Sequence, residues 1–395
     1  MRHVPDIERR SRLVRRHALG PHRLTDPLAA TESVVCLHAT EPATVYLSLA
    51  VRAEGVTADD VHRLLYDDRS LVKQLAMRRT LFAFPRDLLP AVWGSASARV
   101  AEQERKRVAK DAVAAGLTDD GDAWLEEARE RVLALLREHG QLGAQQIREG
   151  VPMLDAKVGT STNPDAKWAG PVQIAPRVLT WLGARGDLVR GVNGGHWRTS
   201  RPQWTAMQPW LGEEAVPLPE AEGYTELVRR WLARFGPGTE NDVVWWLGAT
   251  KAAVRRAFAD LGAVEVALDG GATGWLLPDD LEQEEPVDPA ALLLPVLDPT
   301  TMGWKDRDFY LDPDLTPYLF DSNGNGGTTA WWDGRVVGAW VQDDEGRVEV
   351  LLREDPGRDA RRALDLEAER LTGWLDGQVI SSVYKSRLMK GEPLP

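Results

Sequence analysis

The 395-residue sequence contains one cysteine, Cys36, which excludes an internal disulfide framework and any zinc site built on pairs of thiolates. No apolar run is long enough to span a membrane, because the longest candidate, residues 290–297, is interrupted by Pro295. The N-terminus also lacks the apolar segment of a secretory signal. These absences predict a soluble, cytoplasmic protein that does not act at a membrane.

The usual sequence signatures of metal and hydrolase sites are absent as well. The seven histidines are scattered, and neither H-x-x-x-H, C-x-x-C nor G-x-S-x-G occurs in the sequence. We therefore expect no bound metal ion and no cofactor. Hydrophobic residues at 43% and charged residues at 27% are typical of a globular chain with several domains.

The chain has no overall excess of basic residues, since 48 Lys and Arg face 60 Asp and Glu for a net charge of −12. This charge is uneven: residues 1–110 hold 19 basic and 13 acidic residues, a net of +6, and the remainder carries −18. A basic head on an acidic body could present one concave face to a polyanion such as DNA. Ordinary variation along a long chain explains the same asymmetry, and composition alone does not decide between the two.

Residues 8–115 are predicted to be mostly helical. A basic amphipathic helix begins near residue 8 and ends before Gly20-Pro21, and a second helix is capped by Thr31 and runs through Leu37 until Pro42 stops it. Further helices are expected at 43–53, 58–66 and 96–115, with a strand just before Pro85. Short helices followed by a strand are compatible with a winged helix.

An internal repeat organises the middle of the chain. Leu136–Gly140 resembles Leu232–Gly236 at an offset of 96 residues, and Leu182–Val189 resembles Leu261–Val266 at an offset of 79. Each copy is predicted to form three helices followed by a hairpin, at about 119–205 and 222–280. The difference in offset leaves 17 extra residues in the first copy, which fit the polar stretch 152–170.

Gly-rich turns mark the two predicted hairpins. The first pairs 187–190 with 196–199 through Asn193-Gly194-Gly195, and the second pairs 264–268 with 275–277 through Asp269-Gly270-Gly271. Three helices followed by a two-stranded wing define the winged variant of the helix-turn-helix. The same units also serve as protein-interaction modules, so DNA binding does not follow from them alone.

The segment after Pro286 and Pro289 changes character. Short apolar runs separated by tight turns predict strands at 291–294, 328–332, 336–341 and 348–352, followed by a helix at 359–375. Such closely spaced strands suggest a small barrel or curled sheet. The predicted fold class is therefore α+β, with tandem winged-helix domains followed by a small β-barrel-like C-terminal domain. The predicted domains are 1–118, which holds a candidate catalytic motif, 119–205 and 206–285, the second and third winged helices, and 286–395.

Several motifs occur in the order of a known family. Val35–Pro42 with Tyr46-Leu47 looks like a catalytic-motif stretch, and Met77–Leu81 looks like an R-G-T-L segment. Two C-terminal stretches, Leu294–Arg307 and Asp333–Trp340, look like parts of a barrel domain. Taken together over nearly the whole chain, these stretches resemble the bacterial AlkZ/YcaQ group of winged-helix DNA glycosylases.

The resemblance implies tandem winged helices and a barrel that form a curved DNA-binding body. It also implies a monofunctional glycosylase that acts, without metal or cofactor, on alkylated purines and in some members on crosslinked ones. The implied partner is damaged double-stranded DNA, bound by a monomer. The family motif is Gln-x-Gln or Gln-x-Asp, and the matching positions here are His38 and Thr40.

His38 and Thr40 are thus the candidate catalytic residues. An alkylated purine is already a good cationic leaving group, so the enzyme chiefly has to position a water for C1′ of an oxocarbenium-like sugar. Neutral His38 can accept a proton from that water near neutral pH, and Thr40 can hold it. Residues 38 and 40 lie about 200° apart on a straight helix, so both face one pocket only where the helix ends, as Glu41-Pro42 suggests. We then expect them at the edge of a cleft with room for a nucleotide; the alternative is that His38 packs or caps at a helix terminus.

Arg78, Arg79, His196 and Arg198 are the candidate DNA-binding residues. Consecutive strand residues point to opposite faces, so only one of Arg78 and Arg79 is expected to reach DNA, and a solvated face is the alternative. His196 and Arg198 alternate on the first wing and share a face suited to phosphate or minor-groove contact, unless they only cover a surface hairpin.

Two further groups are weaker candidates for DNA contact. Lys305 and Arg307 flank Asp306 and could equally form a local ion-pair network. In each of the pairs Trp245-Trp246 and Trp331-Trp332, one ring could be an exposed surface on which a base stacks.

The predicted function is a DNA-repair glycosylase of alkylated or bulky purine adducts, with interstrand crosslinks as a further candidate substrate. One alternative is a non-catalytic winged-helix DNA-binding protein, such as a regulator, that lost the family's glutamines. Another is a winged-helix scaffold for protein interactions. Release of free base separates the first from the others, and salt-dependent duplex binding separates the second from the third.

Overall fold

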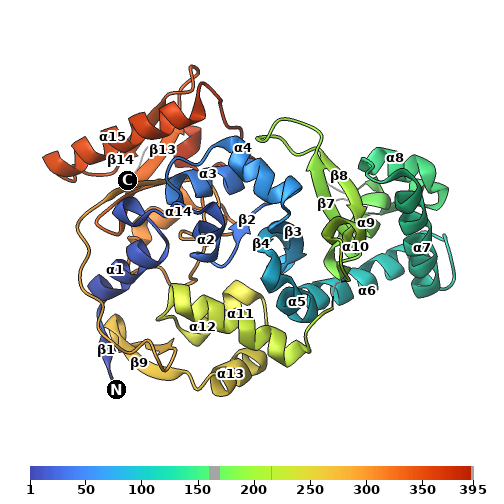
Figure 1. The fold of residues 1–395 in the computed structure, drawn as a ribbon, viewed down its shortest axis with the longest axis horizontal. Helices are drawn as coiled ribbons and strands as arrows, with labels where there is room; N and C mark the ends of the chain where they lie inside the picture. The colour runs from blue at the N-terminus through green and yellow to red at the C-terminus, as the bar shows by residue number, and fades with distance from the viewer. Residues whose placement is uncertain (160–169, 215, 393–395) are drawn as a thin grey trace.

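The computed structural model describes residues 1–159, 170–214 and 216–392 and shows a mixed α/β fold (Figure 1). The N-terminal region contains a three-stranded antiparallel sheet with helices around it. Its helices are α1 (Asp6–Arg16), α2 (Pro27–Glu32), α3 (Pro42–Arg52), α4 (Ala58–His62), α5 (Leu89–Val92) and α6 (Ala98–Ala114). Its strands lie in the order β2 (Leu37–His38), β4 (Thr80–Pro85) and β3 (Leu71–Ala76).

The helix predicted to run from Thr31 through Leu37 is wrong. α2 ends at Glu32, and Leu37 and His38 form β2, which pairs with β4. Val35 has a φ of 66°, which no helix tolerates, and the β-branched residues around it favour a strand. Pro42 does not stop a helix but is the first residue of α3, where its missing N–H costs nothing.

Two copies of the unit helix–helix–helix–hairpin follow, in the order that the repeat predicts. The first contains α7 (Gly121–His139), α8 (Ala144–Gly150), α9 (Ala175–Arg185), β7 (Leu188–Asn193) and β8 (Pro202–Ala206). The second contains α11 (Glu220–Phe235), α12 (Glu240–Leu247), α13 (Lys251–Asp260), β9 (Val264–Leu268) and β10 (Thr273–Leu276). A short helix, α10 (Met207–Leu211), lies between them.

The extra stretch of the first copy contains a small antiparallel hairpin of β5 (Lys157–Gly159) and β6 (Pro171–Gln173). The polar residues expected at 160–169 lie outside the described residues. In Figure 1 the helices of this first copy form a lobe to one side, joined to the rest of the molecule through α6.

The first hairpin exists, but its second strand begins later than predicted. The Asn193 side chain organises a loop: its Nδ2 donates to the carbonyl oxygens of His196 and Thr199 at 3.1 and 2.8 Å, and its Oδ1 accepts the N–H of Arg201 at 2.7 Å. These bonds satisfy the loop backbone without a partner strand. His196 and Arg198 therefore lie in a loop and not, as predicted, on alternating positions of a strand.

The second hairpin agrees with the prediction, and Gly270 and Gly271 supply the left-handed φ values of 76° and 82° that its turn requires. The sequence did not predict that β1 (His3–Val4) adds to β9 in parallel, with His3 opposite Ala267. This pairing ties the N-terminus to a segment more than 260 residues away, which local patterns cannot reveal.

The C-terminal region is an open sheet, so the predicted barrel is wrong. Its antiparallel strands lie in the order β11 (Ala291–Leu294), β12 (Thr329–Trp332), β13 (Arg335–Gln342) and β14 (Val348–Leu352). Helix α15 (Arg358–Leu375) packs on one face through Leu364 and Leu371, against Leu293 and Trp340. The opposite face, which includes Trp331, packs into the main core. Because both faces are already covered, the sheet does not need to close on itself. A short helix, α14 (Thr316–Leu319), lies in the connection before β12.

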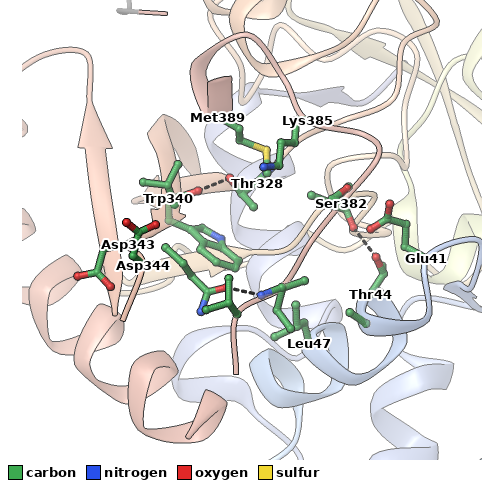
Figure 2. A pocket seen from close by; sticks show the side chains of 16 residues that line it. Glu41, Thr44, Leu47, Thr328, Trp340, Asp343, Asp344, Ser382, Lys385 and Met389 are labelled. Atoms are coloured by element: carbon green, nitrogen blue, oxygen red, sulfur yellow. Dashed lines mark hydrogen bonds between the residues drawn. The ribbon is translucent and has the colours of Figure 1, made fainter. Parts of the chain in front are cut away.

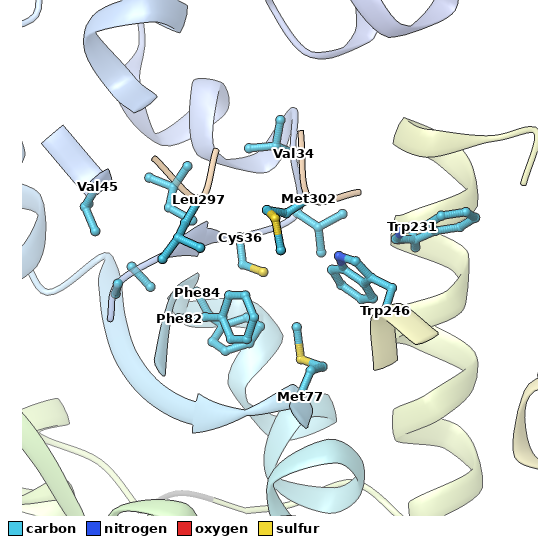
Figure 3. Close-up of a cluster of buried hydrophobic side chains, with 14 of the residues drawn as sticks. Val34, Cys36, Val45, Met77, Phe82, Phe84, Trp231, Trp246, Leu297 and Met302 are labelled. Atoms are coloured by element: carbon cyan, nitrogen blue, oxygen red, sulfur yellow. The ribbon is translucent and has the colours of Figure 1, made fainter. Parts of the chain in front are cut away.

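The largest apolar cluster joins the N-terminal sheet, the second copy and the C-terminal segment (Figure 3). The first copy has its own cluster, built from α6 to β8. The division into four domains stays a prediction, but the packing shows that 1–118 does not have a core separate from the segments 222–261 and 292–388.

Candidate functional site

His38 and Thr40 lie at the end of β2, not at the end of a helix as predicted. β2 itself ends at His38, so Thr40 lies just beyond the strand. His38 is only 5% exposed, and its ring packs 4.6 Å from the ring of Phe82. Both ring nitrogens of His38 and the hydroxyl of Thr40 are buried without a hydrogen-bond partner in the part of the chain that the structure describes. Such orphaned polar groups are rare and costly in a folded protein.

A small cavity adjoins the His38 ring. Cys36, Phe82, Trp246 and Met302 line it together with Arg78 and Pro299, and Figure 3 shows the first four converging on one space. Its volume of about 10 Å³ is close to what one water molecule requires. The expectation of a cleft with room for a nucleotide beside His38 is therefore wrong for this conformation.

The His38 ring is held in its neutral form. Burial lowers its pKa to about 3, and the charge of Arg78 adds to the effect. The prediction that His38 takes a proton near neutral pH is thus not supported. A neutral imidazole instead offers one donor and one acceptor, the same pair of functions as a glutamine amide.

Arg78 and Arg79 occupy the tight turn between β3 and β4 rather than a strand, with φ values of 52° and 59°. They differ in their partners. The Nε of Arg79 lies 2.6 Å from a carboxylate oxygen of Glu104. The guanidinium of Arg78 lies 4.0 Å from the centre of the Trp245 ring and forms no ion pair within the described ranges. Of the two, Arg78 is the cation at the mouth of the His38 cavity.

Arg307 approaches the same indole, with its guanidinium carbon 5.4 Å from the centre of the Trp245 ring. Its position is fixed by Asp242 of α12, a buried carboxylate that accepts the backbone N–H groups of Lys305 and Asp306 at 2.8 and 2.9 Å. Burial and this second cation lower the pKa of Arg78 to about 10, so Arg78 stays charged at neutral pH. Two guanidinium groups on one aromatic ring form a site for an anion.

The local ion-pair alternative for Arg307 and Lys305 is wrong, because neither forms an ion pair in the described residues; Arg307 donates its Nε to the Trp304 carbonyl at 3.0 Å instead. The sequence did contain one signal for this site. Gly248 ends α12 with a φ of 62°, and a Cβ there would lie 3.1 Å from Arg78.

His196 and Arg198 do not form the expected shared face. Their neighbour Trp197 packs against the rings of Tyr46 and Trp374, with centroid distances of 5.1 and 5.7 Å. Arg198 donates its Nη1 to the Val379 carbonyl at 2.6 Å. The loop is thus docked on the protein's own N- and C-terminal regions through Trp197 and Arg198, while His196 is exposed.

The predicted basic face of residues 1–110 does not form along α1. Arg12, Arg15 and Arg16 bind Asp280 and Glu284 of the acidic body, with N to O distances between 2.7 and 2.9 Å. These three basic residues of the head therefore join it to the body and are not free to bind a polyanion.

A larger cavity of about 220 Å³ lies beside the start of α3 (Figure 2). Glu41, Thr44 and Leu47 border it on one side, Trp340 forms a wall, and Lys385 comes from the C-terminal segment. Glu41 is 8% exposed and accepts the N–H of Val383 at 2.7 Å, while burial raises its pKa. No sequence pattern indicates this cavity, because its walls come from distant segments of the chain.

Within the described ranges, no three His, Cys, Asp or Glu side chains come together in a way that could hold a metal ion. A helix with the length and hydropathy needed to cross a membrane is likewise not found among the described residues.

The fold is that of a DNA glycosylase. The chain superimposes on the Streptomyces sahachiroi DNA glycosylase AlkZ with a TM-score of 0.74 and 21% sequence identity, covering 94% of this chain and 98% of that one. No curated protein sequence matches the chain.

Residues 31–374 match the model of the family described as DNA glycosylase AlkZ-like, and the chain belongs to this family. The resemblance in the sequence motifs is thereby confirmed. Family and fold together support a DNA-repair glycosylase, and hence a protein that binds DNA.

Proposed function

We propose that this protein hydrolyses the N-glycosidic bond of alkylated or bulky purine adducts in double-stranded DNA, and that His38 and Thr40 position the attacking water. Interstrand crosslinks are a further substrate to test. The protein would act as a cytoplasmic monomer. The two copies of helix–helix–helix–hairpin would serve as winged-helix units of the DNA-binding body, an arrangement supported by their element order.

The observation that carries the proposal is the set of orphaned polar atoms beside a cavity for one water. Both ring nitrogens of His38, which lines the cavity, are buried and unpartnered in the described structure, and so is the hydroxyl of Thr40 two residues further on. The motif resemblance matches these two positions to the family's catalytic motif. A water in this cavity could donate to one His38 nitrogen while its lone pair faces outward. That nitrogen would then be satisfied, and pairing buried polar atoms is the usual role of an ordered internal water.

The reaction requires an oriented water molecule more than it requires a strong base. When an N7- or N3-alkylated purine leaves, it takes the electron pair of the C1′–N bond and loses its positive charge. The water oxygen forms the new bond to C1′ and releases a proton to solvent. A neutral His38 that hydrogen-bonds the water as a glutamine does suits this reaction, because a cationic ring would repel the oxocarbenium-like sugar.

The positive charge of Arg78 would also repel a cationic sugar unless an anion balances it. We propose that Arg78 and Arg307 bind one DNA phosphate, which neutralises both side chains and places the sugar near His38. Since Arg78 borders the cavity, its side chain has to move toward that phosphate before the sugar can reach the water.

The size of the cavity favours a second candidate function, a DNA-binding protein without catalysis. With His38 5% exposed and no room for a nucleotide, a chain that lost the glutamines could retain the fold for binding alone. The two functions differ in one product, the free base.

The test is base release from duplex DNA that carries N7-methylguanine, and from a crosslinked duplex. We expect the wild-type protein to release methylated base and His38→Ala to do so roughly 10²-fold more slowly, the cost of a mispositioned reactant, with duplex affinity nearly unchanged. His139→Ala, a change at an exposed histidine on α7, is the matched control and should be as active as the wild type. Duplex binding by the wild type without base release from either substrate would establish the second candidate instead.

A further inference from the structure

A second pair of unpartnered cations lies on the other face of the three-stranded sheet. In this sheet His38 of β2 lies opposite Phe82 of β4, and Phe82 lies opposite Gln74 of β3, so these three side chains share one face. Lys73 is adjacent to Gln74 and therefore points to the opposite face. There it meets Arg190 of β7, and both line a cavity of about 20 Å³ between the sheet and the first repeat copy. Figure 1 shows β3 and β7 adjacent at this junction.

The two cations have no counterion. Neither Lys73 nor Arg190 forms an ion pair in the described part of the chain, and Arg190 is the other charged group lining the Lys73 cavity. Lys73 donates its Nζ to the hydroxyl of Tyr66 at 2.5 Å, and Arg190 lies 5.3 Å from the ring of Trp204. The fully buried Arg52, by contrast, is paired with the carboxylate of Asp298.

The burial of Lys73 beside another cation disfavours its charged form. Burial lowers the pKa of Lys73 to about 7, and the charge of Arg190 adds to the effect. The remaining surroundings are Leu179, Thr180 and Gly183 of α9 and Leu188 of β7, which carry no charge. Both cations are partly exposed, so an anion can approach them from solvent.

We propose that Lys73 and Arg190 bind one phosphodiester of the DNA backbone, at a position separate from the His38 site. The guanidinium fork can hold two phosphate oxygens and the ammonium a third contact, with the Tyr66 hydroxyl as a further donor. The inference rests on the DNA-binding part of the proposed function but not on bond cleavage.

Binding of this phosphate is coupled to proton uptake. The bound anion favours the charged form of Lys73, so the wild-type protein should lose duplex affinity as the pH rises through 7. The loss amounts to about tenfold between pH 6 and pH 8. Lys73→Arg keeps the charge at all these pH values and should bind at pH 8 as well as at pH 6.

The experiment measures affinity for an undamaged duplex by fluorescence anisotropy, over a series of salt concentrations at pH 6 and pH 8. Arg190→Gln and Lys73→Gln should each weaken binding and reduce the slope of log affinity against log salt by about 0.9, the value for one phosphate contact. The matched control is Lys106→Gln, because Lys106 is 69% exposed and already paired with Glu102. Lys73→Arg and Arg190→Lys preserve charge and serve if a glutamine variant fails to fold.

Unchanged salt slope in both glutamine variants, or the same pH dependence in Lys73→Arg as in the wild type, would overturn the inference. Inorganic phosphate is the second probe, with Lys73 modification by trinitrobenzenesulfonate as the readout. Protection by phosphate but not by duplex would show that the site takes a free phosphate, which contradicts the backbone assignment. A wild-type protein that shows the salt and pH behaviour but releases no base would leave this inference intact while the glycosylase proposal fails.

Discussion

Replacing Asp298 with asparagine removes the carboxylate that balances Arg52 inside the protein. Arg52 on α3 and Asp298 in the segment after β11 are both 0% exposed, and their two N–O contacts measure 2.8 and 2.6 Å. Ser48 and Thr300 complete the network: Ser48 donates to Asp298 at 3.1 Å, and Thr300 accepts from Arg52 at 2.8 Å. The pair also anchors the segment that carries Pro299 and Met302 to the His38 cavity.

The magnitude follows from burial. An asparagine can replace some of these hydrogen bonds but leaves a guanidinium charge with no access to water, and breaking a buried pair in this way costs about 3–5 kcal/mol. Replacing both partners with apolar residues removes the charge altogether. The double variant Arg52→Met/Asp298→Leu should therefore be more stable than Asp298→Asn and within a few kcal/mol of the wild type.

Urea unfolding followed by tryptophan fluorescence measures these differences. The surface pair Arg131–Glu127, whose side chains are 55% and 52% exposed, provides the control, and Glu127→Gln should cost less than about 1 kcal/mol. A loss below 1 kcal/mol for Asp298→Asn, or a double variant less stable than the single one, would refute the reasoning.

Further predictions concern the site and its loop. Because the pKa of His38 is about 3, base release should not decline between pH 8 and pH 5, and a decline centred near pH 6.5 would mean that His38 titrates normally. His17 and His38 bind protons near pH 6.5 in the unfolded chain, but their lowered pKa values prevent this in the folded chain. Acidification from pH 7 to pH 5 should therefore lower the free energy of unfolding, measured by urea titration, by about 2 kcal/mol for each histidine. Arg78→Gln should weaken duplex binding and reduce the salt slope by about 0.9, while Arg79→Gln, whose arginine is already paired, should change the slope little. Trp197→Ala should lower the free energy of unfolding in the same urea assay by about 2 kcal/mol, roughly half the value for a fully buried aromatic side chain. It should also make the loop susceptible to proteolysis.

The sequence predicted what depends on local patterns. The two copies of three helices and a hairpin, the strands after residue 290 and the helix at 359–375 all follow from periodicity and turn residues, and the structure contains them. The motif resemblance identified the family. The errors at 31–37 and 196–199 arose where contacts that periodicity does not register decide the backbone: β2 pairs with the distant strand β4, and the Asn193 side chain organises the loop that follows it.

The candidate site was predictable in its residues but not in its environment. His38, Thr40 and Arg78 could be selected from the motifs, yet the low pKa of His38 depends on Trp246 and Met302, which are distant in sequence. Long-range partners also explain why the basic residues of α1 are unavailable to DNA. Their acidic partners near residue 280 could not be assigned from composition.

The most direct test of the account compares His38→Gln with His38→Ala in single-turnover base release from a duplex that contains N7-methylguanine. If a neutral His38 positions water as a glutamine does, His38→Gln should retain most of the wild-type rate or exceed it, while His38→Ala loses roughly 10²-fold. Equal rates for the two variants, whether both active or both inactive, would contradict the claim that residue 38 orients the attacking water.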